Sequence, residues 1–275
     1  LLYDESDDYR ISENIDLSKL NILFKRNFNP TYVQEHPHKE KILPLGLNYF
    51  VLGRNDHRLQ RILRAKNDIH KLRNLLKQFA MLTLLLPVSV SPSVVEISAF
   101  EDIPSLSLEP SVLFIAQVWR PERVKSEEHK QDRYQINEMR ANLVRVLRRE
   151  FGQRYIGGLI PNDYAIKYYS DCLIDNEKIT TKKNFLRIVK QIPICVTSNG
   201  LLGSIGYKFA EYIAAARAIV SERNVNQVYG DFREGQNYLS FTSADECAEM
   251  VQTLFDHPEL CMKMMYNNFL YYHLY

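Results

Sequence analysis

The sequence lacks the features by which a metal protein, a membrane protein or a nucleic-acid-binding protein is usually recognised. Its four cysteines are scattered without the close spacing of metal ligands, and Cys195 and Cys261, which lie among apolar residues, are predicted to be buried thiols. No run of about 18 apolar residues occurs, so no membrane-spanning helix is predicted. The formal net charge is only +2, which excludes a bulk electrostatic attraction to nucleic acid or to a membrane.

The length of 275 residues predicts two domains. A segment rich in proline and serine over 88–110 marks the linker, so we expect residues 1–108 to form a partial first domain with the linker and residues 109–275 to form a second domain. The chain begins with Leu1 instead of methionine, in what reads as a strand, so we expect a fragment of a longer protein.

Apolar segments of strand type alternate with amphipathic segments throughout the second domain. The predicted strands cover 111–119, 155–160, 192–196, 218–221 and 238–241. The predicted helices cover 137–151, 163–172, 182–190, 207–216, 244–256 and 259–272. This alternation is typical of an α/β fold in which a parallel sheet has helices on both faces.

The first domain is less regular. Strands are predicted near its first residues and over 20–24, and the segment 41–51, which contains Pro44, reads as an extended connection. A basic amphipathic helix is predicted over 57–80; its charged face either meets anionic lipid or a lipid-diphosphate acceptor, or is the solvated face of a helix packed on the domain. Its basic residues are not interleaved with aromatic ones, so nucleic acid is not predicted as a partner.

A glycine-rich turn joins the predicted strand 192–196 to the helix that begins near residue 207. The glycines that permit this tight turn are Gly200, Gly203 and Gly206. Ser204 is predicted to cap the helix, and the amides of Ile205, Gly206 and Tyr207 are expected to point at an anion that the helix dipole attracts. A plain tight connection is the alternative, since the dinucleotide fingerprint G-x-G-x-x-G is absent.

Glu211 lies seven residues after Ser204 and four after Tyr207, so all three are expected on one face of the predicted helix. A carboxylate at this distance from a phosphate site is placed to accept hydrogen bonds from ribose hydroxyl groups. A solvated helix face is the alternative, but the neighbouring residues 209–214 are mostly apolar and predict a buried helix.

Two arginines follow the first strand of the second domain, at the end that faces the ligand crevice in open α/β sheets. Arg120 is a candidate phosphate-binding residue because its guanidinium presents a fixed fork of donors, and Arg123 is a weaker candidate. The alternative for both is a solvated loop charge. Gln117 and Asn199 are further candidates for the crevice.

An acidic cluster follows the first predicted strand and consists of Asp4, Glu5, Asp7 and Asp8. One of these carboxylates could act as a general base for an acceptor hydroxyl, or stabilise positive charge on a sugar in the transition state. Two alternatives stay open: a D-x-D-like metal site, and an exposed loop with local hydrogen bonds.

The residues after the glycine-rich turn carry a family resemblance. The segment GSIGYKFAEYIAAARAIVSE over 203–222, followed by GDFREGQNYLSF over 230–241, resembles the donor-binding half of GT-B glycosyltransferases, in particular bacterial family 1-like and spore-coat-type enzymes. The resemblance covers about 111–275; residues 1–50 match the last part of such an enzyme's first domain less specifically. It implies two Rossmann-like domains facing a cleft, of which the first is incomplete here.

The resemblance also implies the activity: transfer of a hexose-type sugar from a nucleotide-diphosphate donor to a glycan, lipid-linked or protein acceptor. Such enzymes serve polysaccharide biosynthesis in the cytoplasm, in some cases at the inner membrane face, and need no metal or cofactor beyond the donor. Ser204, Gly206, Tyr207 and Lys208 would hold the diphosphate and Glu211 the ribose. Glu211 and Arg120 are the predicted catalytic residues, with Arg120 offsetting the charge of the leaving group.

One departure from the family pattern concerns catalysis. Many relatives have a glutamate that touches the sugar eight residues before the ribose carboxylate, and Gly203 occupies that position here. Retaining and inverting chemistry therefore both stay open. So do two other functions: a GT-B-type nucleotide-sugar epimerase, and a nucleotide-sugar-binding module without catalysis.

Overall fold

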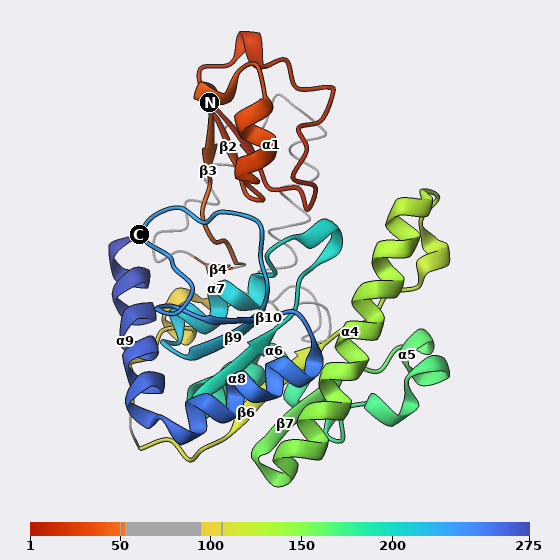
Figure 1. The fold of residues 1–275 in the computed structure, drawn as a ribbon, viewed down its shortest axis with the longest axis vertical. Helices are drawn as coiled ribbons and strands as arrows, with labels where there is room; N and C mark the ends of the chain where they lie inside the picture. Colours follow the sequence, from red (N-terminus) through yellow and green to blue (C-terminus); the bar gives the residue numbers. More distant parts are fainter. Residues whose placement is uncertain (50, 53–94, 106) are drawn as a thin grey trace, which may run out of the picture.

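The computed structural model describes residues 1–49, 51–52, 95–105 and 107–275 (Figure 1). The basic helix predicted over 57–80 lies outside these residues. Within the described ranges, no helix combines the length and the apolar character needed to cross a membrane. All four cysteines are buried and unpaired, which confirms the prediction for Cys195 and Cys261.

A five-stranded parallel sheet forms the centre of the larger part, with the strand order β10-β9-β8-β6-β7. Its strands are β6 (Val112–Ala116), β7 (Tyr155–Leu159), β8 (Ile194–Thr197), β9 (Ala218–Glu222) and β10 (Leu239–Phe241). The chain passes from β6 to β7 on one side and returns to place β8 on the other side. The strand order therefore reverses between β6 and β8, where the carboxyl ends of the strands leave a crevice.

Helices cover both faces of this sheet (Figure 1). They are α4 (Glu127–Phe151), α5 (Asp163–Tyr168), α6 (Lys182–Gln191), α7 (Tyr207–Ala214), α8 (Ala244–Asp256) and α9 (Pro258–Leu274). Alternate residues of β6 enter different cores: Phe114 packs in the cluster that includes α4 and α8, and Ile115 packs in the cluster that includes α6 and α7. The prediction of an α/β fold with a parallel sheet covered on both faces is thus confirmed.

A smaller parallel sheet lies in the first 49 residues, with the order β1-β2-β3. Its elements are β1 (Leu2–Asp4), β2 (Leu23–Lys25), α1 (Pro30–Glu35) and β3 (Ile42–Pro44). The strands β4 (Val51–Leu52) and β5 (Val95–Glu96) pair in parallel as a separate two-stranded sheet. The interpretation of 41–51 as a connection was therefore wrong at β3. Pro44 is tolerated because it ends an edge strand.

The helix predicted over 137–151 begins ten residues earlier, at Glu127. The extra turns carry few apolar residues, so hydrophobic periodicity did not reveal them. Glu127 and Glu128 lie in the first turn, where negative charge stabilises the helix dipole. The predicted domain boundary between residues 108 and 109 falls just before β6 and stays a prediction.

Arg217 ties the segment before β6 to the large sheet. Its side chain is fully buried and donates hydrogen bonds to Asp102 Oδ2 at 3.0 Å and to the carbonyl of Ile103 at 2.8 Å. It also donates to the carbonyls of Ala215 at 2.6 Å and Lys190 at 3.2 Å. One guanidinium thus satisfies four acceptors from three segments of the chain.

We expect Arg217→Met to lower the free energy of unfolding by about 3 kcal/mol, because removal of one partner of a buried ion pair leaves the other groups uncompensated. The matched control is Arg187→Met on α6, an exposed arginine whose replacement should change stability by less than about 0.5 kcal/mol. Urea unfolding followed by circular dichroism measures both. Equal stabilities of the two variants would contradict this role of Arg217.

Candidate functional site

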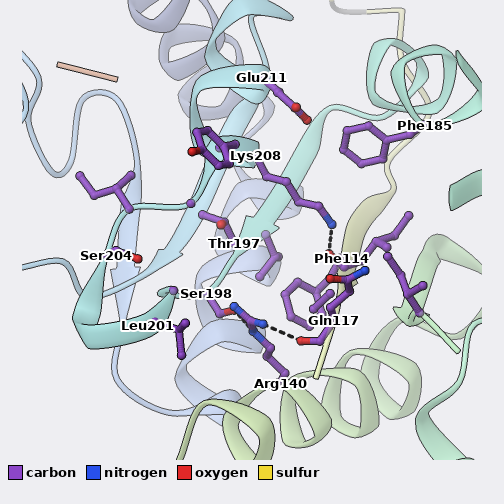
Figure 2. A pocket seen from close by; sticks show the side chains of 18 of the residues that line it. Phe114, Gln117, Arg140, Phe185, Thr197, Ser198, Leu201, Ser204, Lys208 and Glu211 are labelled. Carbon is purple, nitrogen blue, oxygen red and sulfur yellow. Dashed lines mark hydrogen bonds between the residues drawn. The ribbon is translucent and has the colours of Figure 1, made fainter. Parts of the chain in front are cut away.

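A cavity of about 640 Å³ opens at the carboxyl ends of β6 and β8, where the strand order reverses (Figure 2). Its lining residues come both from the segment that contains the small three-stranded sheet and from the segment that contains the five-stranded sheet. The small sheet contributes Asp7 and Arg26, and the large sheet and its helices contribute the rest. The crevice expected from the parallel topology is therefore present.

The predicted site residues of the glycine-rich turn and the helix after it all line the cavity: Ser204, Gly206, Tyr207, Lys208 and Glu211. The helix α7 begins at Tyr207, as predicted, but the cap prediction was wrong, because Gly206 and not Ser204 occupies the N-cap position. Ser204 instead ends a short 3-10 turn over Leu201–Gly203, and its carbonyl accepts a hydrogen bond from the Gly200 amide at 2.7 Å. Residues 201–204 therefore belong to this 3-10 turn and not to the first turn of α7.

The amides at the start of α7 differ in their partners. The Ile205 amide, expected to be free, donates to Asn27 Oδ1 at 3.1 Å. Within the described part of the chain, the amides of Gly206 and Lys208 have no hydrogen-bond partner. These two amides, together with the helix dipole, leave the end of α7 able to bind an anion.

Lys208 points into the cavity, and its Nζ donates to the carbonyl of Ile115 in β6 (Figure 2). The ammonium also lies over the ring of Phe185, with Nζ 5.3 Å from the centroid. Burial lowers the pKa of Lys208 to about 7; Glu211 acts against this change, and the positive charges of Arg140 and Lys182 add to it. Bound anionic oxygens would favour the charged form of this lysine.

Arg140, from the middle of α4, reaches the same strand end from the opposite face of the sheet (Figure 2). Its guanidinium donates to the carbonyls of Gln117 at 2.5 Å and Asn199 at 2.9 Å, and to Ser198 Oγ at 3.0 Å. Burial lowers its pKa to about 10, although Glu222 and Asp132 act in the opposite direction. The guanidinium also stacks on Trp119, with Cζ 4.3 Å from the ring centroid.

Arg140 was not predicted from the sequence. One signal was present: it stands between Ile136 and Leu143 on the face of the helix that packs against the sheet. A charged residue at a core position needs partners, and here these are the acceptors around the cavity.

Arg120 does not line the cavity. Two hydrogen bonds between the Asn137 side chain and the Trp119 backbone, at 3.0 and 2.8 Å, hold the chain after β6, and Arg120 then pairs with Asp163 at 2.6 Å. Arg123 is exposed in the short turn that follows. The guanidinium that the structure places beside β6 is that of Arg140.

The two remaining crevice candidates contribute unequally. Gln117 lines the cavity. Asn199 is outside the lining; its amide donates to Glu222 Oε2 at 2.9 Å and its side chain donates to the carbonyl of Arg223 at 3.0 Å. Asn199 therefore orients Arg140 through its own carbonyl and shapes the turn.

Glu211 is buried, with 5% of its surface exposed, so the interpretation as a solvated helix face is wrong. Its Oε1 accepts from Nζ of Lys182, the first residue of α6. The Lys182 ammonium lies 4.8 Å from the centroid of the Phe100 ring. The carboxylate is thus held in place by an ion pair on the cavity wall.

The acidic cluster after β1 forms separate ion pairs. Asp4 pairs with Lys25 at 2.6 Å, Asp7 with Arg26, and Asp8 with Arg10 at 3.0 Å. Among the described residues, no group of three histidine, cysteine or acidic side chains is arranged to hold a metal ion. The carboxylates of Asp4, Asp7 and Asp8 each have a cationic side chain as partner instead.

Several solved structures of glycosyltransferases are similar to this chain. The carboxyl-terminal domain of a group 1 glycosyltransferase, LpcC from Francisella tularensis, has 10% identity and a TM-score of 0.44, over 65% of this chain and 94% of that chain. HepE from Anabaena in complex with UDP and glucose has 11% identity and a TM-score of 0.40, over 92% of this chain and 73% of that chain. The pneumococcal O-GlcNAc transferase GtfA in complex with UDP and GlcNAc has 14% identity and a TM-score of 0.37, over 80% of this chain and 44% of that chain.

These solved structures are GT-B glycosyltransferases. This is the class that the residues of the glycine-rich turn predicted. With TM-scores below 0.5, the likeness carries no weight for the chemistry, which rests on the geometry of the cavity. No family model matches the sequence, and no match was found among curated proteins.

The lowered pKa of Lys208 predicts a pH effect on stability. Between pH about 7 and the ordinary lysine value of 10.5, the unfolded chain binds a proton that the folded chain does not, so this contribution to stability rises with pH. Relative to Lys208→Met, the natural protein should gain on the order of 2 kcal/mol in unfolding free energy from pH 7 to pH 9. Urea titrations at several pH values measure this difference.

The control for this effect is Lys183→Met, which removes an exposed lysine from α6. Its stability should follow that of the natural protein at every pH. A constant difference between the natural protein and Lys208→Met across this range would show that Lys208 titrates at an ordinary pKa.

Proposed function

We propose that this protein is a glycosyltransferase that binds a nucleoside diphosphate sugar in the cavity at the ends of β6 and β8. The observation that carries the proposal is the convergence of three anion-binding features on one cavity. These are the amino-terminal end of α7 with its amides at Gly206 and Lys208, the Lys208 ammonium and the Arg140 guanidinium.

The charge of the lining supports a diphosphate as the group that is bound. Four cationic side chains described in the lining, Arg26, Arg140, Lys182 and Lys208, face two acidic ones, Asp7 and Glu211. When Lys208 is protonated, the four positive and two negative charges leave a formal excess of two positive charges. A diphosphate balances this excess, whereas a neutral sugar or nucleoside would leave the cations unneutralised.

The rest of the lining suits the other parts of such a donor. Phe114, Ile160 and Phe185 contribute apolar surface to the lining, which suits a flat nucleobase, and the cavity volume lies within the usual range for small-ligand sites. Glu211, held by Lys182, is the residue that we propose to accept hydrogen bonds from the ribose. HepE has been solved with UDP and with UDP-glucose, and GtfA with UDP and GlcNAc.

In the transfer step, negative charge develops on the diphosphate as its bond to the sugar breaks. Groups that are already in place around this charge lower the barrier, because they need no reorganisation. We assign this role to Arg140 and Lys208. The role expected for Arg120 passes to Arg140, since Arg140 is the one that lines the cavity.

The finer parts of the proposal rest on the sequence resemblance. They are a hexose-type sugar, a glycan, lipid-linked or protein acceptor, a metal-independent reaction, a role in polysaccharide biosynthesis, and a cytoplasmic location with peripheral membrane contact through the segment 57–80, for which the sequence predicts a basic helix. The site residues Ser204, Gly206 and Tyr207 belong to the proposed diphosphate contacts. Gln117 and Asn199 would support them.

A nucleotide-sugar-binding module without catalysis is the second candidate, and one observation favours it. In the free protein both carboxylates described in the lining, Asp7 and Glu211, are paired with cations, whereas a general base needs an unpaired group. Gly203 is not part of the lining. A donor-hydrolysis assay distinguishes the two functions in a protein that binds the donor.

The ribose role of Glu211 gives a testable outcome. Glu211→Gln should weaken the binding of UDP by about tenfold, because a hydrogen bond to a charged acceptor is replaced by a weaker one. It should not weaken the binding of 2′,3′-dideoxy-UDP, which lacks the ribose hydroxyl groups. Isothermal titration calorimetry of both ligands measures the two effects.

The matched control is Glu249→Gln on α8, an exposed glutamate remote from the cavity lining. It should bind both ligands as the natural protein does. If Glu211→Gln weakens the two ligands equally, the carboxylate acts on the site as a whole and not on the ribose.

A further inference from the structure

We propose that Arg26, from the small sheet, is a diphosphate-binding residue of the same cavity, and that Asp7 holds its guanidinium until an anion displaces the carboxylate. This inference rests on the proposed function, since it names a further residue of the proposed donor site. Arg26 follows the strand predicted over 20–24, and no local sequence pattern predicts a role for it.

Arg26 lies against the first residue of α7. It follows β2, lines the cavity and has 6% of its surface exposed. Its Nη1 donates to Tyr207 Oη at 3.1 Å, and Cζ lies 5.2 Å from the centroid of the Tyr207 ring. The guanidinium is thus held at the same helix end as the amides of Gly206 and Lys208.

The neighbouring Asn27 fixes this position. It is fully buried, and its Oδ1 accepts from the Ile205 amide at 3.1 Å. Its Nδ2 donates to the carbonyls of Ser6 at 2.9 Å and Asp7 at 3.1 Å. One amide side chain therefore joins the acidic loop, the end of β2 and the glycine-rich turn, which keeps Arg26 beside α7.

The guanidinium of Arg26 has unused binding capacity. Its Nε is buried and has no hydrogen-bond partner among the described residues. A buried donor of this kind is costly unless it finds an acceptor. Oxygens of a phosphate group suit an arginine well, because they match the fork of its donors.

Asp7 is the group with which such an anion would compete. Its carboxylate pairs with Arg26 Nη2, lines the same cavity and is 49% exposed. Since it is half exposed, the carboxylate can return to water at a small cost when a phosphate takes its place. A bound diphosphate would then contact the small sheet through Arg26 and the large sheet through α7 and Arg140.

The test uses calorimetric titrations of the full chain with UDP and with uridine. Arg26→Met should weaken UDP binding by about tenfold or more, through the loss of a charge-assisted hydrogen bond, and leave uridine unchanged. The control is Arg10→Met, which removes an arginine of the same segment that pairs with Asp8 and Glu128 outside the cavity lining. It should bind UDP like the natural protein.

Asp7→Asn supplies a test of opposite sign and guards against a failure of Arg26→Met to fold. Removal of the competing carboxylate should strengthen UDP binding by about threefold or more, and this gain should vanish when Arg26→Met is added. A pair that only stabilises the fold would give no gain. Unchanged UDP affinity in Asp7→Asn, or a gain that persists without Arg26, overturns the inference.

The two proposals fail differently in this experiment. A natural protein that binds neither UDP nor uridine overturns the proposed function, and the role of Arg26 with it. A natural protein that binds UDP, together with a folded Arg26→Met that binds it equally well, overturns the role of Arg26 alone.

Discussion

Two cationic side chains hydrogen-bond to backbone carbonyls at the end of β6, and the candidate site depends on this interaction. Lys208 donates to Ile115 and Arg140 donates to Gln117. The two side chains come from helices on opposite faces of the sheet. The carboxyl ends of parallel strands present carbonyl groups that the sheet itself does not fully satisfy, and here cations from both layers supply the missing donors.

The ammonium of Lys208 and the guanidinium of Arg140 are therefore buried beside the cavity, where water solvates them poorly. Burial lowers the pKa of Lys208 to about 7 and that of Arg140 to about 10, which shows that both cations are held at a cost. An anion in the cavity would offset the desolvation free energy of these two cations by neutralising their charges. The same features that reduce the stability of the free protein would therefore favour an anionic ligand.

Local sequence patterns predicted the parts of the structure that depend on neighbouring residues. Apolar periodicity located α8 and the strands β6 to β10, and the glycine-rich turn located one wall of the cavity. The strand β3 was missed because Pro44 argues against a strand unless its edge position is known. Ser204 was assigned as the cap of α7 because it precedes the helix, whereas in the structure it ends a short 3-10 turn and Gly206 is the N-cap.

Two cationic residues of the cavity, Arg26 and Arg140, were missed for a different reason. Arg120 is adjacent to β6 in sequence, but the chain turns away, and Arg140 reaches the strand end from the middle of α4. Arg26 and Asn27 meet the glycine-rich turn across a separation of about 180 residues, which no local pattern reports. The ion pair between Glu211 and Lys182 is equally non-local, since it joins two helices.

The central claim is that this cavity recognises a diphosphate through its cations. Calorimetric titration of the natural protein with UDP, UMP and uridine, at constant ionic strength near pH 7, tests it most directly. The account predicts that affinity rises with each phosphate, by about tenfold between UMP and UDP, and falls as salt is added. Equal affinities for the three ligands, or no binding of UDP at all, would contradict it.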